Sequence, residues 1–88
     1  MTSAALEGKN HPGTLKIVAN IASNYTSLMD FGKAGPLYER ALEGFEAQFG
    51  KDHTDTKMCA ENYQVCLQYR GDNVERLAQL KRTYPHLK

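Results

Sequence analysis

Residues 31–53 read FGKAGPLYERALEGFEAQFGKDH and contain one strongly amphipathic helix together with the turn that ends it. Apolar side chains recur there at steps of three and four residues, the spacing of one helical face: Phe31, Ala34, Leu37, Tyr38, Ala41, Leu42, Phe45 and Phe49. Charged residues fall mostly between them. Because so broad an apolar face is not stable alone in water, we expect helices before and after this segment to cover it.

Three more segments of the chain show helical periodicity. The first starts at Pro12, which the first turn of a helix tolerates, and runs to about residue 28. After the helix at about 31–48, a third should end near Arg70, and a fourth should stop before Pro85. No segment alternates apolar and polar residues as a strand does. The sequence therefore predicts an all-α fold of four helices joined by short turns.

Polar residues and glycines mark the expected helix ends. Asp30 is expected to cap the helix at 31–48, and either Asp52 or Thr54 to cap the next one. Gly50 is the expected left-handed residue after the second helix. Residues 71–73, Gly-Asp-Asn, are expected to form a turn with a cap.

Pro36 lies inside the segment predicted to form the second helix. It has no N–H to donate to the carbonyl of Gly32, and its ring crowds that carbonyl. We therefore expect a weak or bent first turn in this helix.

Length, composition and charge narrow the class of protein. The 88 residues suit a single domain, 1–88, and 11 basic against 10 acidic residues leave a formal net charge of +1. This balance gives no reason to expect nucleic acid or an anionic membrane as a partner. No apolar run approaches the ~18 residues of a membrane span, and the N-terminus lacks the pattern of a signal peptide. We expect a cytoplasmic setting in which Cys59 and Cys66 stay free thiols.

The chain contains an internal repeat. A shift of 42 residues aligns GKNHPGT at 8–14 with GKDHTDT at 50–56, where four of seven positions are identical. The same shift aligns Asn20 with Asn62 and Arg40 with Arg82. Identity is concentrated at the turn and the start of the first helix, which is the pattern of stacked helical hairpins.

These motifs resemble a known repeat family. The segment PLYERAL at 36–42 and the GKDH…DT pattern at 50–56 are similar to the 42-residue tetratricopeptide (TPR) repeat of the kinesin light chain type, which uses a PLYxRAL second helix and a GxDHPDT joint. The match is strong over residues 8–56, fair to residue 72 and poor beyond Val74. The resemblance implies two stacked antiparallel helical hairpins of a TPR-like α-α superhelix, with repeat 1 at about 8–49 and repeat 2 at about 50–88.

Three residues depart from the family pattern. Met29 stands where the family has a glycine between paired helices, so we expect a shifted turn without a left-handed backbone. Gln64 occupies a small-residue position and is expected to hold helices apart or to face water. Arg76 stands in place of an alanine, and the polar last helix is a candidate C-terminal cap.

The resemblance also implies a binding surface, because the first helix of each TPR pair lines a concave groove. The corresponding positions here are Lys16, Ala19, Asn20, Ser23, Ser27, Met58, Glu61, Asn62, Val65 and Tyr69. The family often uses an asparagine at the position of Asn20 and Asn62 to hydrogen-bond the backbone of an extended peptide, which suits an amide that both donates and accepts. The alternative is that both asparagines bond neighbouring helices or only water.

Charge at the implied groove bears on the ligand. Lys16 offers a contact to an acidic group, whereas Met58 and Glu61 favour a mixed or partly apolar peptide over a purely acidic one.

Other reactive side chains point to no enzyme and no cofactor. Cys59 and Cys66 lie two turns apart on one helix, too far for a disulfide, and are expected to be buried. His11 and His53 stand at equivalent repeat positions and, like His86, show no zinc spacing. Catalytic triads, phosphate loops and paired-carboxylate patterns are absent from the sequence, and Asp52 and Asp55 match capping roles.

The sequence therefore predicts a protein–protein interaction module that binds a peptide segment in a concave groove. Repeat arrays usually need at least ~3 repeats, and this chain carries two. The alternative is a self-assembling structural unit, a homo-oligomer through repeat stacking, or a fragment of a longer TPR array.

Overall fold

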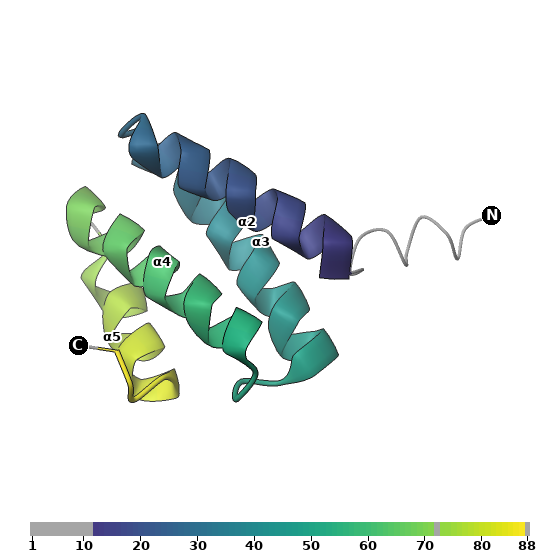
Figure 1. Cartoon of the computed structure of the whole chain (residues 1–88). Helices are drawn as coiled ribbons and strands as arrows, with labels where there is room; N and C mark the ends of the chain where they lie inside the picture. The colour runs from purple at the N-terminus through teal and green to yellow at the C-terminus, as the bar shows by residue number, and fades with distance from the viewer. Residues whose placement is uncertain (1–11, 72, 88) are drawn as a thin grey trace.

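Four helices make up the computed structural model, which describes residues 12–71 and 73–87. They are α2 (Pro12–Ser27), α3 (Phe31–Phe49), α4 (Thr54–Arg70) and α5 (Val74–Thr83). Consecutive helices run antiparallel through short turns (Figure 1). No strand occurs in the described residues, so the predicted all-α fold of four helices is confirmed. Asn10, His11 and Asp72 lie outside the described residues.

Helix α3 lies at the centre of the packing. It packs against α2 and against α4, and α5 packs against α4. The predicted face of α3 supplies much of the core, and its buried members are Ala34, Tyr38, Ala41, Leu42 and Phe45. Leu15, Val18 and Ala22 meet it from α2, and Cys59, Ala60, Tyr63, Cys66 and Leu67 meet it from α4. Both cysteines are buried and free, as predicted.

A glycine sets how closely α2 and α3 approach. A Cβ atom added to Gly44 would lie 2.3 Å from a terminal methyl carbon of Leu15. Leu15 is completely buried and has little room to move away. Gly44 therefore serves as a contact surface for a core leucine.

Helix α3 passes through Pro36 without interruption. Before the proline, the N–H groups of Lys33 and Ala34 donate to the carbonyl of Asp30 at 3.2 and 3.1 Å. The proline therefore does not end the helix, and the expected bend stays a prediction.

Two of the predicted caps are wrong. Asp30 makes no side-chain cap bond, because its carboxylate lies 3.7 Å from the ammonium of Lys33 instead. The cap of α4 is His53, whose Nδ1 accepts from the N–H of Asp55 at 3.1 Å, rather than Asp52 or Thr54. Stacking on Phe49, with ring centroids 4.3 Å apart, orients the His53 ring for this bond.

The glycines at the helix ends behave differently from each other. Gly50 has the expected positive φ of 85°, but its ψ of 170° is extended, so the predicted left-handed conformation is wrong there. Gly71 is left-handed, with φ 73° and ψ 1°, and Asn73 Oδ1 accepts from the N–H of Arg76 at 3.3 Å. The predicted cap at this point is therefore confirmed at Asn73, whereas Asp72 of the predicted turn lies outside the described residues.

Met29 has a left-handed backbone, so the predicted turn without one is wrong. Its φ is +61°, and its N–H donates to the carbonyl of Thr26 at 2.9 Å. The N–H of Asp30 donates to the carbonyl of Tyr25 at 2.8 Å. These two bonds form a Schellman motif, which satisfies carbonyls at the end of α2 and holds a non-glycine residue in a strained conformation.

Helix α5 is held to α3 by two polar contacts. Arg76 donates from Nε and Nη2 to the carboxylate of Glu39 at 3.1 and 2.7 Å, and the hydroxyl of Tyr63 donates to the same carboxylate. The hydroxyl of Tyr84 donates to Glu46 of α3. Arg76 therefore replaces the family's alanine with a two-bond contact across the fold.

The apolar side of the C-terminal segment is also buried, through Leu80, Tyr84 and Leu87. Gln64 of α4 is only 8% exposed, so the expectation that it faces water is wrong. It lies beside Leu87 and His86, which the segment after α5 brings back onto α4.

Replacing Met29 with glycine should stabilise the chain. Glycine adopts a positive φ without the steric cost of a Cβ, and part of that gain is lost to its freedom in the unfolded state. We expect M29G to raise the free energy of unfolding by about 0.5–1 kcal/mol, measured by urea denaturation. Leu28→Gly is the matched control, because residue 28 has no positive φ and gains nothing. A loss of stability in M29G would contradict the assignment of strain to Met29.

The stabilising effect of Glu39 should depend on pH. Burial acts to raise the pKa of Glu39, but hydrogen bonds from Arg76 and Tyr63 outweigh it and hold this pKa below its ordinary 4.5. Because the folded-state pKa is the lower one, the contribution is present above pH 4.5 and is lost as the pH falls through the folded-state value.

We expect E39Q to lower the free energy of unfolding by about 1–2 kcal/mol at neutral pH. The difference from the wild type should shrink as the pH is lowered below 4.5. Urea denaturation across this pH range measures it. E43Q makes the same change at an exposed position of α3 and should have little effect. A difference that does not change with pH would show that the charge of Glu39 is not responsible.

Candidate functional site: a groove between α2 and α4

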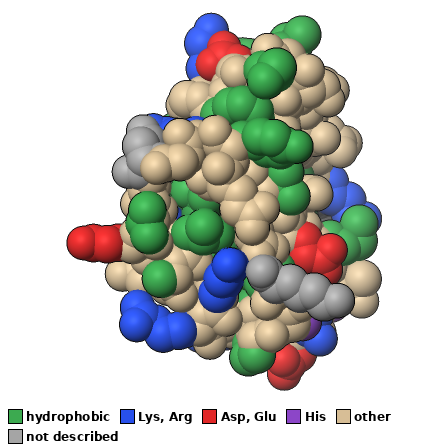
Figure 2. All heavy atoms as spheres, turned by 90° about the vertical axis from the view of Figure 1, so that its left-hand side faces the viewer, with side chains coloured by type: hydrophobic (Ala, Val, Ile, Leu, Met, Phe, Trp, Pro, Cys, Tyr) green, Lys and Arg blue, Asp and Glu red, His purple; other side chains and the backbone are tan. Residues whose placement is uncertain are grey.

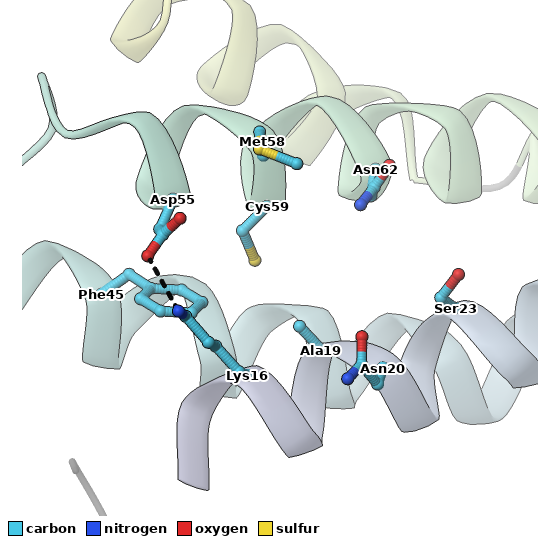
Figure 3. A pocket seen from close by; sticks show the side chains of 9 residues that line it. All are labelled: Lys16, Ala19, Asn20, Ser23, Phe45, Asp55, Met58, Cys59 and Asn62. Carbon is cyan, nitrogen blue, oxygen red and sulfur yellow. Dashed lines mark ion pairs between the residues drawn. The ribbon is translucent and has the colours of Figure 1, made fainter. Parts of the chain in front are cut away.

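The described helices enclose a groove between α2 and α4. Both helices pack on α3, and a half-open cavity of about 270 Å³ lies between them (Figure 3). Its walls and floor are Lys16, Ala19, Asn20 and Ser23 from α2, Phe45 from α3, and Asp55, Met58, Cys59 and Asn62 from α4. The structure thus brings together six residues of the implied binding surface, namely Lys16, Ala19, Asn20, Ser23, Met58 and Asn62.

The other four implied residues lie elsewhere. Glu61 and Val65 line a second cavity of about 340 Å³ with Gln64, His86 and Leu87, and Glu61 lies 3.4 Å from His86 Nε2. Ser27 is exposed at the end of α2 and does not line the groove.

Tyr69 stacks on Phe31, with ring centroids 5.4 Å apart. Hydrophobic side chains are visible on the face that carries this end of α4 and the α2–α3 turn (Figure 2). A peptide contact at Ser27, Glu61, Val65 or Tyr69 stays a prediction.

Asn20 and Asn62 extend into the groove from opposite walls (Figure 3). Both residues are exposed, and neither side-chain amide bonds another described residue. Each amide therefore keeps its donor and acceptor groups available to water or a ligand. The alternative, in which these asparagines hydrogen-bond neighbouring helices, is therefore wrong for the described residues.

An ion pair crosses one end of the groove. The ammonium of Lys16 lies 3.9 Å from the carboxylate of Asp55. The pair is partly exposed, so its stabilising effect is small, on the order of 0–1 kcal/mol. Asp55 therefore offsets the positive charge of Lys16, which the sequence predicts to be available to an acidic ligand.

Phe45, Asp55 and Cys59 line the groove but are not among the residues that the sequence predicts for it. Asp55 and Cys59 are spaced by four residues along α4, and the predicted Asn62 follows three residues later, so all three occupy one helical face. The sequence predicts a capping role for Asp55 and a buried position for Cys59. Phe45 of α3 is a buried core side chain that also lines the groove between α2 and α4.

The surroundings of the thiol on the groove floor disfavour its nucleophilic thiolate form. Burial, aided by the carboxylates of Glu46 and Glu39, raises the pKa of Cys59 to about 12. Its Sγ lies 3.7 Å from the carbonyl of Tyr38. Burial also raises the pKa of Cys66. Both cysteines act as small apolar side chains.

Comparisons with protein-family models, curated proteins and solved structures found no match to this chain. Within residues 12–71 and 73–87, no cluster of three or more His, Cys, Asp or Glu side chains is placed to hold a metal ion. No helix of the same residues has the length and apolar character needed to cross a membrane. The likeness to TPR repeats rests on the sequence motifs quoted above.

The native chain should react slowly with thiol reagents. The thiolate is the reactive form, and both buried cysteines have a raised pKa. At about pH 8 we expect iodoacetamide to label the folded chain at least ~100-fold more slowly than the chain in urea, as followed by mass spectrometry. S23C, which places a thiol at an exposed groove position, should gain one fast label. Fast double labelling of the folded wild type would contradict this burial.

Proposed function

We propose that this chain is a protein-interaction module of the TPR kind that binds an extended peptide in the groove between α2 and α4. The observation that supports it is the placement of Asn20 and Asn62. They occupy equivalent repeat positions and extend from opposite walls of one groove with their amides unbonded to the described chain. Two such amides can each bind a peptide group of a strand lying between them.

The groove floor supports an apolar side chain in the ligand. Ala19, Phe45 and Cys59 provide apolar surface, and Met58 adds a flexible thioether at the rim. A cavity of about 270 Å³ suits one aliphatic side chain of a peptide and is small for a cofactor. The proposed binding mode is therefore backbone recognition by the asparagines with one apolar anchor.

Charge supports a peptide of mixed character. The Lys16–Asp55 pair presents both signs at one end of the groove, so a run of acidic residues would meet Asp55 as well as Lys16. A ligand with one charged residue near this end replaces a weak exposed pair with a contact of similar strength. Affinity then depends mainly on the amides and the apolar floor.

A binding role suits this groove better than a catalytic one. Its thiol has a pKa raised to about 12, and its carboxylate lies beside an ammonium. The free, buried cysteines are in keeping with a cytoplasmic setting, which is part of the proposal.

The test uses a phage-displayed library of linear random peptides about ten residues long, panned against the full chain. A selected peptide is synthesised, and its dissociation constant is measured by fluorescence anisotropy. We expect N20A and N62A each to weaken binding about 5–10-fold, because each removes hydrogen bonds to a peptide group. Circular dichroism should show unchanged helicity, since neither amide bonds the described chain.

Asn24→Ala is the matched control, because Asn24 lies exposed on α2 and does not line the groove. It should leave the affinity unchanged. Failure to select any peptide, or equal affinity in N20A, N62A and the wild type, would overturn the proposed function. A loss of helicity in the groove variants would assign the asparagines to the fold instead.

A further inference from the structure

Helix α2 has an exposed apolar stripe that faces neither the core nor the groove. Ile17 is 59% exposed and Ile21 42%, and Leu28, just beyond the helix, is 74% exposed. With the exposed Asn24 they follow one another at steps of four, three and four residues. This spacing is that of the seam along which one helix packs against another.

The stripe is also free of charge. The single charged residue of α2 is Lys16, which lines the groove and pairs with Asp55. Exposed helix faces normally carry charged side chains, as α3 does with Arg40 and Glu43. An uncharged outer face with three exposed aliphatic side chains indicates a surface that another molecule covers.

We propose that this α2 stripe, Ile17, Ile21, Asn24 and Leu28, is a two-fold interface between two copies of the chain. A two-fold axis sets the same face of both copies together, so a charge close to the axis would lie near its own copy and be repelled by it. The stripe meets that requirement. Asn24 is self-complementary as well, since an amide donates to and accepts from a second amide.

A head-to-tail arrangement fits the surfaces less well. It would place the far end of the chain, α5, against α2 of the next copy. The exposed side of α5 carries Glu75, Gln79 and Arg82 beside Val74, so two charges and a polar amide would lie against aliphatic side chains. Like-on-like pairing of α2 avoids this cost and closes at two copies.

The test measures mass against protein concentration by light scattering on the full chain. We expect a weak dimer, with twice the 9.9 kDa chain mass at high concentration and a dissociation constant in the micromolar range. I17E and I21E should each raise that constant about tenfold or more, because a charge enters an apolar seam. V74E makes a like change at an exposed valine of α5 and should leave it unchanged.

Residue 24 gives a sharper test. Neither N24D nor N24K should disturb the fold, because Asn24 is exposed and aspartate has nearly the same shape as asparagine. Each variant should weaken the dimer, because the new charge is repelled by the same charge on the second copy. Mixing the two variants should restore dimers, a result that only like-on-like contact at this residue explains.

Three outcomes would overturn the proposal: a monomer at every concentration, a dimer that I17E leaves intact, or species that keep growing beyond two copies. The groove lies on another face of α2, so failure of dimerisation would leave peptide binding untouched, and the reverse also holds.

Discussion

The burial of α3 against two neighbours is the constraint on which the rest of the structure depends. On one side Gly44 lets Leu15 of α2 come into contact. On the other side Tyr38 stacks on Tyr63 of α4, with ring centroids 6.2 Å apart. Because α2 and α4 both rest on α3, they stand apart from each other and leave a groove whose floor is Phe45. The core and the candidate site therefore share two side chains, Phe45 and Cys59.

The helices could be predicted because their signals are local. Periodicity along α3, together with Pro12, Gly71 and Pro85, is enough to place four helices within a few residues. The turn at Met29 could not be predicted, because two backbone hydrogen bonds impose the left-handed conformation against the preference of the residue. Likewise, His53 caps α4 only because stacking on Phe49 orients its ring, and that contact is not visible in composition.

The candidate site was predictable where the repeat held and not where it failed. Asn20 and Asn62 lie on opposite walls of the groove because the internal repeat places them at equivalent points of α2 and α4 (Figure 3). Glu61 and Val65 instead lie with His86 and Leu87, because the divergent C-terminal segment folds back over that side of α4. Arg76, which breaks the motif, anchors this segment through Glu39. The C-terminal segment thus decides which part of the expected surface stays open.

Helix α2 has a core face, a groove face and an outer face, and its one charged residue lies on the groove face. Leu15, Val18 and Ala22 face the core, and Lys16 and Asn20 face the groove. Lys16 is the single charged residue of α2 and lies on the groove face, so the outer face carries no charge. Its pairing with Asp55 places both signs of charge at the groove. The position of Lys16 therefore bears on both proposals: it supplies mixed charge for the proposed peptide and leaves the outer face uncharged for the proposed like-on-like contact. Moving the positive charge of Lys16 to the outer face would remove the ion pair from the groove and add a charge to the α2 stripe. The position of this one charge therefore affects both proposed interactions.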